Sequence, residues 1–239
     1  MQTSTGTRMI TLYGMSSPNV VKVLLILEEL GEEYVFERCD VILGEQFTDR
    51  FLAMNPNAKV PVIVDDSAAD GPLTIFESGA ILFYLAERAG QFLPGSGAGR
   101  YKAMQWLMFQ MAGVGPMFGQ AIHFRDRPTG NDYAVERYKR ELVRLCNVID
   151  GALQQTGYLS GADYNIADMG VFPWMRTCSR FFPDVEFASA TREWYDRVAA
   201  RPATIRALEV VDKLSNLDKS SMKSASPEQI IRYYGRPRD

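Results

Sequence analysis

The chain has 239 residues, of which 46% are hydrophobic, so it can form one large domain or two small ones, each with a buried core. Its formal net charge of −3 provides no general positive field, which argues against nucleic acid or an anionic membrane surface as a partner. No apolar run is long enough to span a membrane, and the polar first eight residues lack the apolar core of a secretion signal. We therefore expect a cytoplasmic protein.

The pattern of the first part of the chain predicts a small α/β domain. Apolar and polar residues alternate in the short expected strands, and apolar residues recur at helical spacing before Gly31. The order β-α-β-α-β-β-α predicts a thioredoxin-like domain over residues 9–90, with a mixed four-stranded sheet and helices on both faces. In chain order we expect a strand at 9–13, a helix from Pro18 to Leu30, a strand at 34–41, a short irregular helix at 45–54, strands at 60–64 and 73–76, and a last helix at 78–89.

The second part of the chain predicts helices alone. A Gly-rich linker at 91–99 precedes a helical domain at 100–214, with tails at 1–8 and 215–239. We expect the first helix to be kinked or broken between Gly113 and Gly119. Asn165 has the pattern of an N-cap, with Asp168 three residues later. The expected helices are 100–118, 132–156, 166–178, 189–200 and 203–214, and a further short helix is expected to begin in the tail near Ser226.

The three cysteines, Cys39, Cys146 and Cys178, are odd in number and far apart in the sequence. Their spacing fits neither a disulfide framework nor a structural zinc site. Each falls inside an expected strand or helix, which favours a place in the core.

Val60 and Pro61 stand where an apolar run begins. Because proline cannot donate to a sheet ladder, Pro61 belongs at the first position of a strand or at an edge. If the bond before Pro61 is cis, the N–H and C=O of Val60 face solvent and can pair with an extended peptide. Glu77 and Ser78 stand at a helix start, where free N–H groups and the Ser78 hydroxyl can hold a carboxylate. Together these features predict a small acidic peptide as ligand.

Four motifs, at residues 16–19, 55–61, 76–81 and 115–120, resemble the glutathione transferase family, most closely its Nu-class and prion-like nitrogen-regulator-like branch. The resemblance covers about residues 9–208. It implies the glutathione transferase fold, glutathione as co-substrate without a metal, and a homodimer. It also implies a second substrate that is a small disulfide or an electrophile.

By this resemblance Ser17 and Asn19 stabilise the glutathione thiolate, with Ser17 in the place of a usual threonine. A free thiol has a pKa of about 8.5, so a hydrogen bond and a helix N-terminus are needed to favour its ionised form. The alternative is that Ser17 only caps the helix and Asn19 binds no ligand. Tyr13 is a further catalytic candidate, but its place in a strand favours burial. No cysteine lies between residues 14 and 20 to act as a nucleophile.

The resemblance also assigns the remaining contacts to glutathione. The main chain of Val60, before Pro61, pairs with the cysteinyl unit, and Glu77 and Ser78 hold the γ-glutamyl end. Gln46 is expected near the glycyl or γ-glutamyl end. Lys59 is expected at the glycyl carboxylate, and Arg137 is expected to reach the ligand, in one arrangement from a neighbouring subunit. For each of the two, the alternative is a solvated side chain at the surface.

A second-substrate pocket is expected between the two domains. Methionine and aromatic side chains are also ordinary core residues, and the single histidine also fits a structural role. The residues expected to line the pocket are Met15, Met117, Phe118, His123 and Phe124.

The leading hypothesis is glutathione-dependent thiol–disulfide exchange, in which bound glutathione supplies the thiolate. A second hypothesis is glutathione transfer to an aromatic electrophile, or cleavage of a thioether. A third is a non-catalytic binding or regulatory module, which the intact 17–19 and 77–78 motifs and the absence of an Asn/Gln-rich tail disfavour.

Overall fold

The computed structural model describes residues 9–126 and 130–235. The chain forms two compact units, one made of the described residues up to Ile81 with those from Arg206 onward, the other of Leu82–Ile205. The domain limits read from the sequence, 9–90 and 100–214, stay a prediction.

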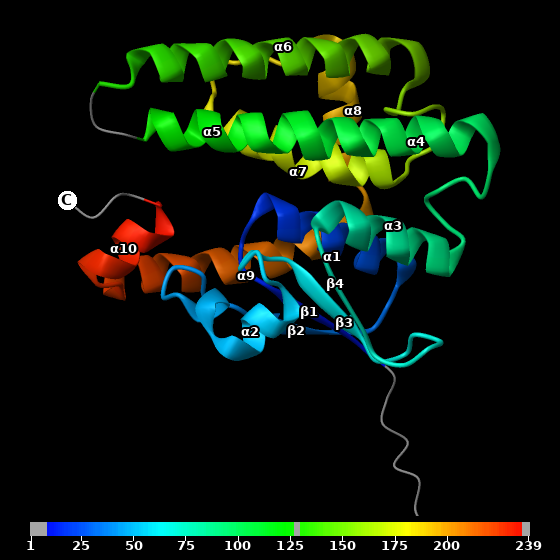
Figure 1. Cartoon of the computed structure of the whole chain (residues 1–239). Helices are drawn as coiled ribbons and strands as arrows, with labels where there is room; N and C mark the ends of the chain where they lie inside the picture. The colour runs from blue at the N-terminus through cyan, green and yellow to red at the C-terminus, as the bar shows by residue number, and fades with distance from the viewer. Residues whose placement is uncertain (1–8, 127–129, 236–239) are drawn as a thin grey trace, which may run out of the picture. The chain divides into compact units, whose positions relative to one another are not determined.

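The first unit contains the predicted mixed sheet. Its strands lie in the order β2-β1-β3-β4, with β1 parallel to β2 and antiparallel to β3, and β3 antiparallel to β4 (Figure 1). This is the thioredoxin-like arrangement expected from the sequence. The elements are β1 Ile10–Gly14, α1 Pro18–Leu30, β2 Tyr34–Arg38, η1 Glu45–Phe47, α2 Asp49–Met54, β3 Val62–Asp65 and β4 Leu73–Phe76. Helix α3, Ser78–Ala89, begins in this unit and continues into the other.

Helix α1 has a cap at each end and a buried middle. Ser17 is extended and caps the N-terminus, Pro18 occupies the first turn, and Gly31 ends the helix at φ 64°. Every residue from Val20 to Leu27 is buried. Figure 1 shows α1 and α2 on opposite faces of the sheet, as predicted.

Two strands are shorter than predicted. β2 ends at Arg38 because the chain then turns around Asp40, whose carboxylate accepts the N–H groups of Ile42 and Leu43 at 3.1 and 3.2 Å. β3 begins at Val62, since Pro61 has no N–H for the ladder.

The second unit is helical over its described residues apart from one isolated bridge between Tyr158 and Gly161. The predicted interruption is a π-helical turn, η2, directly before Gly115 and Pro116. Proline has no N–H to continue the ladder of the preceding turn. The helices are α4 Gly97–Phe109, α5 Gly115–Arg125, α6 Asp132–Thr156, α7 Ile166–Phe181 and α8 Ser189–Ala199, with η2 at Gln110–Val114.

The last helices, α9 Pro202–Ser224 and α10 Pro227–Tyr233, correct the sequence analysis. We expected a helix end at Leu214 and a tail beyond it, but α9 continues to Ser224. The polar residues that suggested a tail include Asp218 and Ser221, both buried and hydrogen-bonded to Arg38. The short helix expected near Ser226 is confirmed, with Ser226 as its N-cap.

The N-cap predicted at Asn165 is confirmed. Its side chain accepts the Ala167 N–H at 3.0 Å, and Asp168 returns a bond by accepting the Asn165 N–H at 3.1 Å. The other oxygen of Asp168 accepts the Leu159 N–H at 3.1 Å and the indole N–H of Trp194 at 2.8 Å. Burial raises the pKa of Asp168 to about 6, against the effect of these hydrogen bonds. Asp168 therefore joins the start of α7 to α8.

No helix within the two described ranges is long and apolar enough to cross a membrane.

Asp168→Ala should lower the free energy of unfolding by about 3 kcal/mol, because three buried donors lose their acceptor. Urea denaturation followed by circular dichroism measures this loss. Asp163→Ala is the matched control, since the Asp163 side chain is exposed a few residues earlier. Equal stabilities of the two variants would contradict a structural role for Asp168.

Candidate functional site

The start of α1 has the two features that stabilise a bound anion. Ser17 Oγ accepts the Val20 N–H at 3.3 Å, so the hydroxyl keeps its own hydrogen for donation. Asn19 lies in the first turn, at the positive end of the helix dipole. Ser17 is thus an N-cap, as the alternative reading proposed, and it can also donate to a ligand.

The Val60–Pro61 peptide bond is cis, which is the condition that the sequence analysis set for a free Val60 main chain. Asn55 organises the turn before it, donating to the Lys59 carbonyl at 2.7 Å and accepting the Asn57 N–H at 2.9 Å. No hydrogen bond joins the main chain of Val60 to another residue within the described ranges. A peptide can therefore pair with both main-chain groups of Val60.

The turn between β4 and α3 has an unusual backbone. Glu77 lies at φ 71°, a region that costs a non-glycine residue about 1–2 kcal/mol, and its side chain is exposed. Ser78 follows at the start of α3 and is 3% exposed. The first N–H groups of α3 thus stand beside a hydroxyl, in an arrangement suited to a carboxylate.

Lys22 is a candidate site residue that the sequence did not predict. This side chain is only 1% exposed, in the apolar run of α1, and its Nζ donates to Ser78 Oγ at 3.2 Å. Burial lowers the pKa of Lys22 to about 7, while the charge of Glu77 acts in the opposite direction. The one signal in the sequence is a single lysine among the apolar residues 20–27.

Gln46 has a buried oxygen without a partner. Its amide nitrogen donates to the Val41 carbonyl at 3.1 Å, but Oε1 is buried and accepts no hydrogen bond from the described residues. Such a group costs about 1–3 kcal/mol, so its presence marks a place where a ligand N–H can bind. Lys59, the candidate for the glycyl carboxylate, is exposed.

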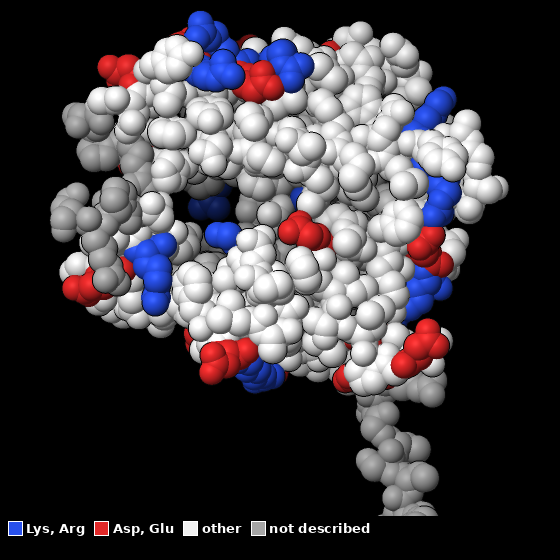
Figure 2. Space-filling view, viewed as in Figure 1, with Lys and Arg blue, Asp and Glu red and all other residues white. Residues whose placement is uncertain are grey.

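Figure 2 shows acidic and basic side chains interspersed over the face that it draws, in agreement with the small net charge. Within the described residues, no cluster of three or more His, Cys, Asp and Glu side chains could hold a metal ion.

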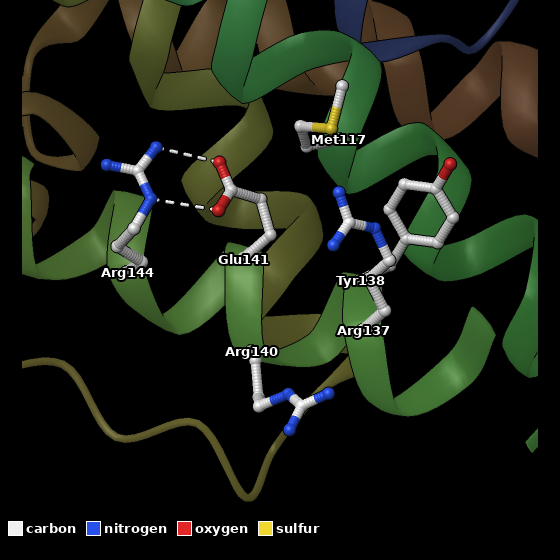
Figure 3. Close-up of a pocket in the computed structure, with 6 residues that line it drawn as sticks. All are labelled: Met117, Arg137, Tyr138, Arg140, Glu141 and Arg144. Carbon is white, nitrogen blue, oxygen red and sulfur yellow. Dashed lines mark hydrogen bonds and ion pairs between the residues drawn. The ribbon is translucent and has the colours of Figure 1, made fainter. Parts of the chain in front are cut away.

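Arg137, on α6, lines an open pocket of 480 Å³ in the second unit. Glu141 is held there by Arg144, which donates to both of its carboxylate oxygens at 2.8 and 2.7 Å. These bonds, led by the Arg144 side chain, lower the pKa of Glu141. The guanidinium of Arg137 points toward Met117 and Arg140 points away (Figure 3). With one carboxylate engaged, the pocket keeps an excess of positive charge.

The expected second-substrate residues are distributed over both units. Met15 is buried in the first, and the α5 residues belong to the second. Phe118 is fully buried, which favours a core role for it. His123 packs edge-on to Phe124, which stacks on Tyr138 at 5.4 Å. Their common pocket stays a prediction.

The alternative nucleophiles differ in exposure. Tyr13 lies in β1 but is only half-buried, less than expected, and its hydroxyl accepts a hydrogen bond from Arg50 at 3.2 Å. Cys39, Cys146 and Cys178 are all buried and reduced. Burial raises the pKa of Cys39 to about 12. A hydrogen bond with Cys146, together with burial, raises the pKa of Cys178.

Residues 8–87 match the family model "Glutathione S-transferase, N-terminal domain". The disulfide-bond oxidoreductase YfcG of Escherichia coli is 43% identical over 203 residues, which are 84% of this chain and 94% of that relative. The chain belongs to the glutathione transferase family. The disulfide-bond oxidoreductase YghU, also of E. coli, is 36% identical over an alignment that covers 84% of this chain and 74% of that relative.

Two solved structures of the family have this fold with ligands. A member from Pseudomonas fluorescens, with two glutathione bound, is 41% identical with a TM-score of 0.79, covering 84% of this chain and 92% of that one. A transferase from Pseudomonas putida, with one glutathione disulfide bound per subunit, is 34% identical with a TM-score of 0.78, covering 87% and 94%.

Lys22→Met should change how stability depends on pH. Above about pH 7 the folded protein has lost the Lys22 proton that the unfolded chain retains, so the wild type gains stability as pH rises. Relative to Lys22→Met, its free energy of unfolding should rise by about 1.4 kcal/mol per pH unit between pH ~7 and ~9.

Urea denaturation at several pH values measures this difference. Lys213→Met, at an exposed lysine on α9, serves as the control. If the difference in free energy of unfolding between the wild type and Lys22→Met stays constant with pH, this would contradict a buried amine with a lowered pKa.

Proposed function

We propose that this family member binds glutathione in its thioredoxin-like unit and uses the glutathione thiolate to reduce small disulfides. The observation that carries the proposal is the unpaired main chain of Val60, in the same unit as the carboxylate seat at Ser78 and the anion-stabilising start of α1. The names of the E. coli relatives and the ligands of the Pseudomonas structures support it.

In this proposal each part of the tripeptide has a chemically matched partner. The cysteinyl unit pairs with the N–H and C=O of Val60, as an added strand does. The γ-glutamyl carboxylate lies on the α3 N-terminus and Ser78, with Lys22 beneath, and its ammonium group faces Glu77. Gln46 offers Oε1 to a ligand N–H. Lys59 is assigned the glycyl carboxylate, and Arg137 a further ligand carboxylate.

The reaction needs no thiol of the protein. The Ser17 hydroxyl and the Asn19 amide donate to the glutathione sulfur, favouring its thiolate. The thiolate attacks one sulfur of the substrate disulfide, forming a mixed disulfide and releasing one substrate thiolate. A second glutathione thiolate then attacks the glutathione sulfur of the mixed disulfide, giving glutathione disulfide and the second substrate thiolate.

Glutathione transfer to an electrophile is the second candidate function, favoured by the family to which the chain belongs. Both reactions use the same thiolate, so they share the first unit and differ in the second substrate. Parallel assays with a small disulfide, a chloronitrobenzene and a thioether distinguish them. Faster turnover of either of the last two would replace disulfide reduction as the main activity.

Asn19→Ala and Ser17→Ala should lower disulfide turnover about 10–100-fold while glutathione affinity falls less than threefold, because their bonds go to the developing thiolate. Steady-state kinetics and titration calorimetry separate the two effects. Tyr13→Phe is the matched control and should keep wild-type turnover.

Equal losses of turnover and affinity would remove Asn19 and Ser17 from the chemistry. No heat of glutathione binding to the wild-type protein would overturn the proposed function itself.

We also propose that the protein is a homodimer. Tyr101 and Met108, one heptad apart on α4, are 69% and 51% exposed and can form an apolar contact between two copies of the chain. Sedimentation equilibrium should give about twice the chain mass of 26.9 kDa. Tyr101→Glu with Met108→Glu should lower it to one chain, and a wild-type mass of one chain would contradict the proposal.

A further inference from the structure

The C-terminal part of α9 is bonded to the turn that carries Ser17. Asp218 is 7% exposed, and its Oδ2 accepts both the N–H and the hydroxyl of Ser16, at 2.9 and 2.5 Å. Its Oδ1 accepts two bonds from the Arg38 guanidinium, at 2.8 and 3.3 Å. One carboxylate therefore fixes the residue directly before Ser17 and the end of β2.

A second link leads from α9 to the loop between β2 and η1. Ser221 accepts a bond from Arg38 at 2.9 Å and donates its own hydrogen to Asp40. Although burial opposes ionisation of Asp40, the bonds from Ser221 and Arg38 outweigh it and lower the pKa of this carboxyl. The ionised Asp40 in turn accepts the N–H groups of Ile42 and Leu43.

Helix α10 holds the far end of the same loop. Gln229 and Arg232 both donate to the Leu43 carbonyl, at 3.0 and 3.1 Å. The Arg232 guanidinium also lies 5.1 Å from the centre of the Phe47 ring. At Gly44, with φ 98°, a Cβ atom would stand 2.0 Å from Arg232 Nη2, so glycine is needed both for the backbone and for this approach. Gln46 lies in η1, directly after the loop held in this way.

We propose that α10 and the part of α9 from Asp218 onward position the residues of the glutathione site without contacting the ligand themselves. Asp218 acts through Ser16 on the thiolate-stabilising turn at Ser17, and Gln229 and Arg232 act through Leu43 on Gln46. These are positioning residues, because each reaches the ligand only through another group. The inference rests on the proposed function and assigns a role to a segment that the sequence suggested was a tail.

The two links predict two different kinetic effects. Asp218→Asn removes one acceptor oxygen, so Ser16 loses a partner and the Ser17 hydroxyl is less well placed for the sulfur. The pKa of bound glutathione, read from the pH profile of kcat/KM for the disulfide at saturating glutathione, should rise by about one unit, and turnover at neutral pH should fall about tenfold. Glutathione affinity should change less than twofold.

The double variant Gln229→Ala with Arg232→Ala instead releases the loop between β2 and η1, which precedes Gln46. Glutathione affinity, measured by calorimetry, should fall about fivefold, while turnover at saturating glutathione and the pH profile should stay as in the wild type. Glu209→Gln, at an exposed position on α9, is the control for both and should leave every parameter unchanged. A purely structural role would lower stability in both variants without this division between turnover and affinity.

Should Asp218→Asn fail to fold, Ser16→Ala removes the hydrogen bond from the Ser16 hydroxyl to Asp218, and the same changes in pKa and turnover are expected. Wild-type glutathione binding together with unchanged turnover, pH profile and affinity in the variants would overturn this inference alone. Absence of glutathione binding by the wild type would overturn it together with the proposed function.

Discussion

A protein that binds a peptide by its main chain must keep a few of its own main-chain groups out of its secondary structure. Here these groups are the N–H and C=O of Val60, which form no hydrogen bond with a described residue. The turn before it is held by Asn55, a buried side chain that accepts the Asn57 N–H and donates to the Lys59 carbonyl. Val60 stays available because its neighbours are satisfied by a side chain and the strand begins only at Val62.

The same unit concentrates positive potential where an acidic tripeptide needs it. The α1 N-terminus carries Ser17 and Asn19, and the α3 N-terminus carries Ser78, so two sets of free helix N–H groups are available for anions. Lys22 joins the two helices, since it lies on α1 and donates to Ser78. A buried amine at this place costs desolvation in the free protein, and a bound carboxylate repays part of that cost by favouring its protonated form.

The sequence predicted the parts of this arrangement that local chemistry determines. Strand alternation, the stop at Gly31 and the pair Asn165 and Asp168 each depend on neighbouring residues, and the structure confirms them. The sequence left the cis bond before Pro61 as a condition, and the structure supplies it. Lys22 was missed because its partner, Ser78, lies 56 residues later, and no periodicity signals such a contact.

The segment after Leu214 shows the same limit more strongly. Its serines, lysines and aspartates have the composition of a solvated tail, and composition cannot show which polar side chains face inward. Asp218 and Ser221 are one turn apart on α9, so both face Arg38 and form a single bonded group with Asp40. Such a group is stable only with all members present, because removing one leaves a buried charge or donor unpaired. That interdependence gives α9 a fixed register against the turn at Ser16 and the loop at Asp40, which a purely apolar contact would define less sharply.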